Sequence, residues 1–283
     1  MDTLLLIRER YSSLSAVEKR IADYVFESGE AILEMSSQEV SKKLGSSSAS
    51  LVRFSRKLGY DGFSQFKQKL SAAYAMHAED DRYYDEVSDA ETPLSIKNKL
   101  KVRINHMVET TNTALSDETM ISVVSCLDKV EVIFVFGIGA SAIVAQDLFQ
   151  KFSSIGKQVY FLQDTHLLVS SLSVQKDQAA FIGISMKGET KEVIELANVV
   201  KSMQVPMIAI TSNEKSTLGQ LSDYVLHSIS GEDFQMRTAA TMSLMAQLYV
   251  VDILFYMYVS EHFEQSYRNL QKTSQAIKAL GQD

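Results

Sequence analysis

The 283-residue chain has little cysteine, little proline and no long apolar run. Its one cysteine, Cys126, cannot form an intrachain disulfide, which excludes a disulfide scaffold and fits a reducing compartment. Near the N-terminus, a short apolar run meets charged residues at 8–10, a pattern unlike a secretory signal. The run Val250–Val259 is too short to span a bilayer and contains Asp252. We therefore expect a cytoplasmic protein with no membrane partner.

The acidic and basic residues are unevenly distributed. The chain has 28 Lys and Arg against 35 Asp and Glu, for a net charge of −7, and 46% of its residues are hydrophobic, as in globular proteins. Residues 1–77 nevertheless have a net charge of +2, and Ser41–Leu70 alone reaches +6. This basic patch indicates a site for a polyanion, although a solvated helix face gives the same pattern. Residues 79–91, with seven acids, are typical of a linker between two domains.

The N-terminal 77 residues contain no proline, and their apolar residues recur at helical spacing. Ser15 and Glu18 have the spacing of a capping box at the start of a helix. Further along, the serines at 36–37 and 46–47 precede two short helical patterns, which are separated by Gly45. Glycine tolerates the positive φ of a turn. Two short helices about such a turn indicate a helix-turn-helix, whose second helix lies in the major groove of DNA.

The second of these helices carries the candidate DNA contacts. Small polar side chains at its start allow the backbone to approach base edges, and Arg53 is suited to a guanine edge or a phosphate. Other basic residues are placed for phosphates, which position a protein without reading the sequence. N-capping of the helix is the alternative role for the serines. The candidate DNA-binding residues are Ser47, Ser48, Ser50, Arg53, Arg56, Lys57, Lys42 and Lys43.

These residues also carry a family resemblance. The stretch SQEVSKKLGSSSASLVRFSRKLGYDGFSQFKQKL, residues 37–70, resembles the N-terminal domain of the RpiR (MurR/RpiR) family of bacterial transcription regulators. The specific part is RFSRKLGYDGFSQFK, and the resemblance covers residues 1–77. It implies that operator DNA is a partner of this chain.

After the linker, the pattern changes to short apolar strands that alternate with helices. This alternation predicts a parallel sheet with helices on both faces, and such a sheet requires apolar strands throughout. The residues from Met236 onward have a helical pattern. We expect strands at Val132–Phe136, Val159–Leu162, Ala179–Ile184, Met207–Thr211 and Tyr224–Ile229, and helices at Ala142–Ile155, Thr190–Met203 and Ser216–Leu221.

Two of the strands end in loops rich in glycine and hydroxyl side chains. The loops are GIGAS at residues 137–141 and SMKGET at 185–190, and each leads into a helix. Ligands of parallel sheets bind beyond the carboxyl ends of the strands, and free helix N-termini suit an anion. With the charge of Lys187, the pattern predicts a site for a phosphate monoester, unless the loops only cap their helices. Ala142 stands at the third glycine position of a dinucleotide-binding fingerprint, so the match to that class is incomplete.

The segments around these loops resemble the SIS (sugar isomerase) domain. The matching stretches are GIGASAIVAQDLFQKFSSIGK, ISMKGETKEVIELA and IAITSNEKSTLGQLSDYVL, within about Thr110–Ser260. The family's second loop is typically S-x-S-G-x-T, whose hydroxyls hold a sugar phosphate. Ser185, Gly188 and Thr190 match that loop, and Lys187 replaces its second serine.

The resemblance completes the set of candidate effector contacts. Ser141 matches the serine of the family's first loop. SIS enzymes place catalytic groups after the fifth strand, where Glu232 and Arg237 stand, although a surface ion pair is the alternative. The candidate effector-binding residues are Gly139, Ser141, Ser185, Lys187, Gly188, Glu189, Thr190, Glu232 and Arg237.

The expected architecture is an all-α helix-turn-helix domain followed by an α/β SIS domain, with three αβα layers and a five-stranded parallel sheet in flavodoxin-like order. The expected boundaries are 1–77 for the DNA-binding domain, 78–109 for the acidic linker and connecting helix, 110–260 for the SIS domain and 261–283 for a C-terminal helix. We expect no cofactor, and no metal site because the five histidines are scattered along the chain.

The expected function is a transcriptional repressor of sugar or amino-sugar catabolism genes. Its effector is a phosphorylated sugar or amino sugar, and the protein is not expected to be an enzyme. We expect it to form a homodimer or homotetramer. One alternative is a sugar-phosphate isomerase, with Glu189 or Glu232 as its general base. The other is a DNA-binding regulator whose sugar pocket is degenerate because of Lys187.

Overall fold

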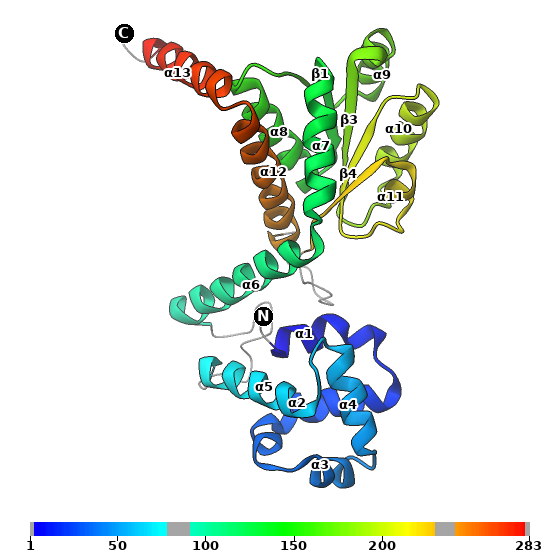
Figure 1. The fold of residues 1–283 in the computed structure, drawn as a ribbon, viewed down its shortest axis with the longest axis vertical. Coiled ribbons are helices and arrows are strands. Elements are labelled where there is room, and N and C mark those ends of the chain that lie inside the picture. The colour runs from blue at the N-terminus through cyan, green and yellow to red at the C-terminus, as the bar shows by residue number, and fades with distance from the viewer. Residues whose placement is uncertain (1–2, 78–90, 230–240, 281–283) are drawn as a thin grey trace. The chain divides into compact units, whose positions relative to one another are not determined.

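The computed structural model describes residues 3–77, 91–229 and 241–280, which are coloured in Figure 1. These residues form two units that divide within the helix α6 (Pro93–Ala114), between Glu109 and Thr110. The first unit is helical, and the second contains the sheet.

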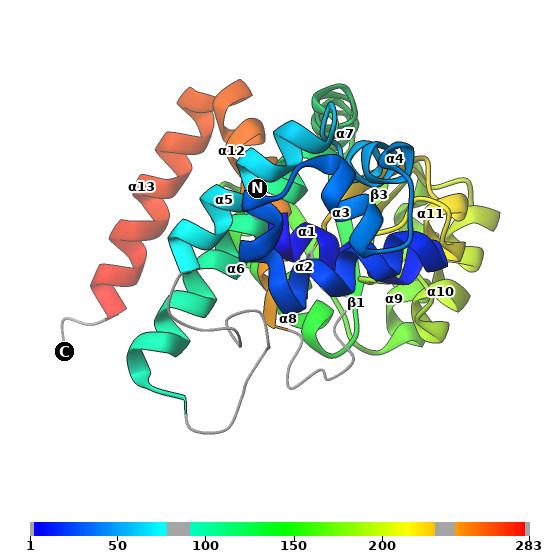
Figure 2. The same ribbon diagram turned by 90° about the horizontal axis from the view of Figure 1, so that it is seen from below.

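The first unit is an all-α domain around one apolar core, with its helices seen in Figure 2. Phe54 and Phe66 meet edge to face with 5.5 Å between ring centroids, and Ile21 and Leu51 are fully buried in the same core. Its elements are α1 (Thr3–Arg10), the 3-10 helix η1 (Tyr11–Ser13), α2 (Ala16–Glu34), α3 (Ser37–Lys43), α4 (Ser48–Lys57), α5 (Phe63–His77) and the first part of α6.

Serine caps start three of these helices where the sequence spacing predicts them. Ser15 caps α2 in a capping box, since its hydroxyl accepts the Glu18 N–H and its own N–H donates to Glu18 at 2.8 Å. Ser36 forms the same box with Glu39 at the start of α3, and Ser47 caps α4. Each cap satisfies an amide that the helix leaves free, which sets the residue at which the helix begins.

The second unit has a five-stranded parallel sheet in the order β2-β1-β3-β4-β5. This flavodoxin-like order confirms the predicted fold class. Every strand begins and ends within two residues of the predicted run. The strands are β1 (Val132–Gly137), β2 (Gln158–Phe161), β3 (Ala179–Ile184), β4 (Met207–Thr211) and β5 (Tyr224–His227).

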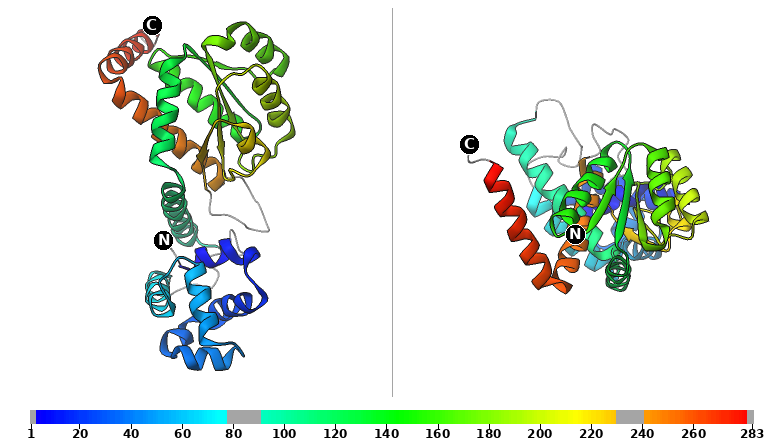
Figure 3. Two further views of the ribbon diagram at one scale, coloured as in Figure 1. Left: turned by 45° about the vertical axis from the view of Figure 1, so that its right-hand side comes forward. Right: turned by 90° about the horizontal axis from the view of Figure 1, so that it is seen from above.

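Helices cover both faces of this sheet and complete the three layers, as Figures 1 and 3 show. Alternate side chains of β1 serve the two faces: Ile133 and Val135 pack with α7, α8 and α12, and Phe134 and Phe136 pack with α9, α10 and α11. Two of these helices, α7 and α9, were not among those predicted. The helices are α7 (Asp117–Lys129), α8 (Ala140–Ser154), α9 (Thr165–Gln175), the 3-10 helix η2 (Lys176–Gln178), α10 (Lys191–Ser202), α11 (Thr217–Leu221), α12 (Thr241–Glu261) and α13 (Phe263–Leu280).

Helix α12 contains the apolar run at 250–259 and is longer than that run. By length and composition alone it is apolar enough to cross a membrane, and among the described helices no other passes that test. Its place in the fold explains the composition, because Val250, Val251 and Leu254 are fully buried in the core of the second unit. Its Asp252 pairs with Lys151 of α8 at 2.6 Å. These contacts are those of a core helix.

Candidate functional site

Helix α4 buries its apolar side chains and exposes part of the predicted set of DNA contacts. Leu51 and Phe54 are fully buried, whereas Ser47 and Arg53 are exposed. Gly45, between α3 and α4, has a φ of +57°, which is the conformation that favours glycine. The two helices and this turn therefore have the helix-turn-helix arrangement that the sequence predicts.

The hydroxyl groups at the start of α4 bond to neighbours within the motif. Ser47 Oγ lies 3.0 Å from Ser50 Oγ, and Arg53 Nη2 donates to Ser50 Oγ at 3.2 Å. Ser48 Oγ lies 3.3 Å from Ser41 Oγ, which links α4 to α3. Ser47, Ser50 and Arg53 thus form one linked polar group, while Ser48 contributes to the packing of the two helices.

The predicted basic residues of this unit differ in their contacts. Lys57 Nζ donates to the Glu18 carboxylate at 3.0 Å, so Lys57 is engaged inside the domain. Arg56, Lys42 and Lys43 are exposed. A phosphate contact by Lys57 would break an existing ion pair. Among the described residues, Arg56 donates to the Asp61 carbonyl and Lys43 lies over the Tyr24 ring, and neither contact is an ion pair.

The β1–α8 loop places Ser141 at the carboxyl end of β1. A Cβ added to Gly137 would lie 2.6 Å from the Ser141 carbonyl oxygen, so this close approach requires glycine. Gly139, the N-cap of α8, has a φ of +62° and provides no side-chain cap. Ser141 is only 9% exposed, and it donates its hydroxyl to Oε1 of Gln247 on α12 at 3.1 Å. The loop therefore holds a buried hydroxyl beside an uncapped helix.

The β3–α10 loop folds so that its two hydroxyl groups meet. Ser185 Oγ lies 2.9 Å from Thr190 Oγ1, and Ser185 is buried. Between them, Gly188 has a φ of +68°, and its N–H donates to the Ser185 carbonyl at 3.0 Å. The Gly188 carbonyl accepts the Leu218 N–H at 3.0 Å, which fastens the loop to α11. The hydroxyls predicted to hold phosphate are therefore brought together.

Further contacts hold the same loop against β4 and α11. The Met186 carbonyl accepts the Thr211 hydroxyl at 3.1 Å. The Glu189 carboxylate accepts both the N–H and the hydroxyl of Thr217, each at 2.8 Å. These bonds lower the pKa of Glu189 below its ordinary value. Both Glu189 oxygens are therefore engaged at the start of α11.

Lys187 has a different environment from its neighbours in the loop. It is exposed, whereas Ser185 is 3% exposed. Glu232 and Arg237 lie outside the described residues. The predicted residues that the structure brings to the carboxyl ends of the paired strands β1 and β3 are Gly139, Ser141, Ser185, Lys187, Gly188, Glu189 and Thr190.

The helices that follow β1 and β3, α8 and α10, differ from the capped helices of the described chain. Serine or aspartate side chains cap α2, α3, α4, α7, α9 and α11. No side-chain hydrogen bond caps α8 at Gly139 or α10 at Thr190. At α8, the Ser141 and Ala142 amides donate to the Ile138 and Gly139 carbonyls. The uncapped amides of α10 and the positive dipole ends of both helices are suited to an anion.

Three residues of this region were missed by sequence reasoning. Gln247 could have been found from the sequence, because it is a polar amide within the apolar helical pattern of α12. Thr211 and Thr217 left none, because their roles depend on contacts with a loop more than twenty residues earlier in the chain.

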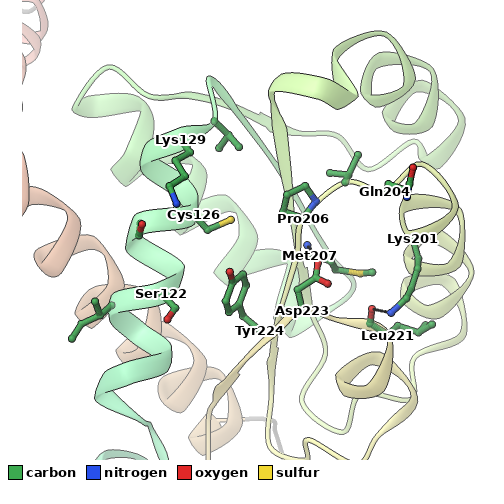
Figure 4. Close-up of a pocket in the computed structure, with 14 residues that line it drawn as sticks. Ser122, Cys126, Lys129, Lys201, Gln204, Pro206, Met207, Leu221, Asp223 and Tyr224 are labelled. Carbon is green, nitrogen blue, oxygen red and sulfur yellow. Dashed lines mark hydrogen bonds between the residues drawn. The ribbon is translucent and has the colours of Figure 1, made fainter.

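A cavity of about 990 Å³ lies at the other end of the strands (Figure 4). Its lining includes Pro206 and Tyr224 near the amino ends of β4 and β5, with Cys126 and Lys129 from α7. Burial raises the pKa of the Cys126 thiol, and the nearby Asp223 carboxylate adds to this rise. None of the described candidate effector residues lines this cavity, which is therefore separate from the predicted phosphate site.

Known proteins match both units of the chain. Residues 1–77 match the helix-turn-helix domain of the rpiR family, and residues 127–257 match the SIS domain. A protein of Thermotoga maritima, named as an uncharacterized HTH-type transcriptional regulator, is 33% identical over 99% of each chain. The Bacillus subtilis HTH-type regulator YbbH is 30% identical, over 98% of this chain and 97% of its own.

Solved structures share the fold. NanR of Vibrio vulnificus, solved in complex with ManNAc-6P, matches 99% of this chain and 100% of its own, with a TM-score of 0.61 at 23% identity. The sugar isomerase domain of an RpiR transcription factor from Sphaerobacter thermophilus matches 64% of this chain and 98% of its own, with a TM-score of 0.57 at 17% identity. From its sequence relatives and domain matches, the chain belongs to the RpiR family of helix-turn-helix transcriptional regulators, with a SIS domain as its second domain.

Proposed function

We propose that this regulator represses genes of sugar or amino-sugar catabolism and senses a phosphorylated sugar or amino sugar. Residues 1–77 bind operator DNA, residues 78–109 are the linker and connecting helix, residues 110–260 bind the effector, and residues 261–283 are the C-terminal helix. The protein acts in the cytoplasm. It forms a homodimer or homotetramer, since helix-turn-helix proteins commonly dimerise on paired half-sites.

The observation that carries the effector proposal is the pair of uncapped helices at neighbouring strands. α8 and α10 both start at the carboxyl edge of the sheet without a side-chain cap. Ser141 stands at one of these termini, and the bonded hydroxyls of Ser185 and Thr190 stand at the other. The backbone amides of α10, with the Ser185 and Thr190 hydroxyls at its positive dipole end, suit a phosphate monoester. The complex of NanR with ManNAc-6P supports the same class of ligand.

On the DNA side, we assign base contacts to the linked group of Ser47, Ser50 and Arg53. This group is at the N-terminal end of α4, the end that reaches base edges when such a helix lies in the major groove. The exposed Arg56, Lys42 and Lys43 are assigned to phosphates, which set affinity and salt dependence.

An isomerase is the weaker candidate. It needs a general base free to reach the sugar, and Glu189 has both carboxylate oxygens bonded to Thr217. The relatives of this chain are also named as transcriptional regulators. The degenerate-pocket alternative depends on Lys187, which is exposed while Ser185 and Thr190 keep their contact.

The effector proposal is tested by fluorescence anisotropy on a promoter DNA of adjacent sugar-catabolic genes, at fixed salt. Hexose and hexosamine 6-phosphates, including ManNAc-6P, are titrated into the complex. We expect one of them to weaken DNA binding, and the Ser185→Ala/Thr190→Ala variant to lose that response while it retains DNA binding. Ser202→Ala, an exposed serine at the far end of α10, is the matched control.

Other outcomes of this titration contradict specific parts of the proposal. Specific DNA binding that no sugar phosphate alters would favour the degenerate pocket. An undiminished response in the double variant would place the sensing site elsewhere. Turnover of a sugar phosphate into its isomer by the full chain would support the enzyme.

The DNA-reading proposal has its own variant. Arg53→Ala should weaken operator binding by about 1–3 kcal/mol and relax the sequence preference if the guanidinium reads a base. Arg20→Ala, which removes an exposed arginine on α2, is the control for charge alone. Equal effects of the two variants would contradict the assignment of α4 as the reading helix.

A further inference from the structure

Gln247 is an exception within its helix. α12 buries apolar side chains such as Val250 and Val251, yet Gln247 is only 1% exposed among them. Its carbonyl Oε1 accepts the hydroxyl of Ser141 at 3.1 Å. Its Nε2 is fully buried and has no hydrogen-bond partner among the described residues. A buried amide whose NH₂ group lacks a hydrogen-bond partner lowers the stability of the fold, whereas a methionine side chain at the same place would leave no such group unpaired.

The contact decides what Ser141 can offer a ligand. A hydroxyl has one hydrogen to donate and two lone pairs to accept with. Ser141 gives that hydrogen to Gln247, so its oxygen is left as an acceptor. An acceptor suits a hydroxyl or amide N–H of a sugar and does not suit an unprotonated phosphate oxygen, which has no hydrogen to give.

The β3–α10 loop offers hydrogen-bond donors, in contrast to the acceptor at Ser141. Ser185 and Thr190 share one hydrogen bond between two hydroxyls, so one hydrogen of the pair remains for a ligand. The uncapped amides of α10 add further donors. The phosphate would therefore sit at the β3–α10 loop, and the sugar ring would face Ser141.

We infer that Gln247 is a positioning residue of the effector site, which holds the Ser141 hydroxyl as an acceptor for a hydroxyl or amide N–H on the sugar part of the effector. This inference rests on the proposed sensing function. Gln247 acts through Ser141 and sits on α12, 106 residues from the serine it orients.

The test is a binding cycle by calorimetry on the full chain. The ligands are the hexosamine 6-phosphate that the wild type binds most tightly and its deoxy analogues, each lacking one ring hydroxyl or the amide. We expect one analogue to bind the wild type about tenfold more weakly than the parent. The Gln247→Met variant should bind the parent about tenfold more weakly, and should bind that same analogue no worse than the wild type does.

Controls separate this result from damage to the fold. Gln247→Met keeps the volume and removes an unpaired buried amide, so its denaturation midpoint should equal or exceed that of the wild type. Ser243→Ala, one turn earlier on α12 and also buried, should leave both affinities unchanged. Ser141→Ala should reproduce the Gln247→Met pattern and add nothing to it in the double variant.

Each remaining outcome is decisive. If the wild type binds none of the sugar phosphates, the proposed sensing function fails. If it binds them and Gln247→Met has the same affinities, Gln247 is only a packing residue. If Gln247→Met weakens every analogue by the same factor, or if the wild type tolerates every deoxy change, Ser141 is no acceptor for the sugar.

Discussion

Replacing Gly188 with alanine should destabilise the second unit more than the same replacement at Gly45 destabilises the first unit. Gly188 has a φ of +68°, which costs a non-glycine residue about 1–2 kcal/mol. The new Cβ would also lie 2.0 Å from Ser216 Oγ. Ser216 is 1% exposed and caps α11 through the Gly219 N–H, so its displacement loses a cap worth about 1 kcal/mol. The expected loss is about 2–3 kcal/mol.

Gly45→Ala is the matched variant for this prediction. Gly45 has a similar φ, +57°, and a Cβ there meets nothing within 4 Å. It should therefore cost the first unit only the backbone term, about 1–2 kcal/mol. Urea denaturation of both variants, followed by circular dichroism, gives the two free energies of unfolding. A loss of stability at Gly188→Ala no larger than the loss at Gly45→Ala would refute the steric part of the reasoning.

Two further predictions concern titrating groups. Burial raises the pKa of Cys126, so at neutral pH a smaller fraction of this thiol is thiolate than in free cysteine. Iodoacetamide should therefore alkylate Cys126 at about pH 7.5 at least several-fold more slowly than it alkylates free cysteine. An equal rate would contradict this. Burial alone raises the pKa of Glu18, but hydrogen bonds from Ser15 and Lys57 outweigh it and lower the pKa. The wild type should therefore be more stable than Glu18→Gln by about 0.2–1 kcal/mol above about pH 5, and this difference should disappear as the pH falls through the lowered pKa. Thermal melts that show the same difference at every pH would contradict this.

Local patterns in the sequence predicted the parts of the fold that depend on neighbours in the chain. The apolar runs indicated strands such as Ala179–Ile184 at the observed residues, because a strand buried on both faces needs an unbroken run. The capping box of Ser15 and Glu18 was visible because both partners lie within one turn. Helix α9 was missed, since THLLVSSLSVQ mixes apolar residues and serines without a clear amphipathic face.

Several contacts at the candidate sites join distant residues, and these were not predicted from the sequence. Glu18 and Lys57 are 39 residues apart, so sequence reasoning assigned Lys57 to DNA without seeing its ion pair. Glu189 is a candidate general base by residue type, and only the fold brings its carboxylate to Thr217. Residue type alone indicates which groups can accept or donate, and the fold decides which of those groups are already engaged.

The hydrogen bonds that hold the β3–α10 loop have a thermodynamic consequence for the proposed binding of a sugar phosphate. Gly188 is bonded to Leu218, Glu189 to Thr217, and Met186 to Thr211, so the loop's shape is established when the domain folds. The entropy of ordering the loop is then lost during folding, and a ligand does not lose it again on binding. Loosening one of these bonds, as in Thr217→Val, transfers that entropy to the binding step. If this loop binds the effector as proposed, the sensitivity of the regulator is therefore adjustable from α11, at a residue that need not contact the effector.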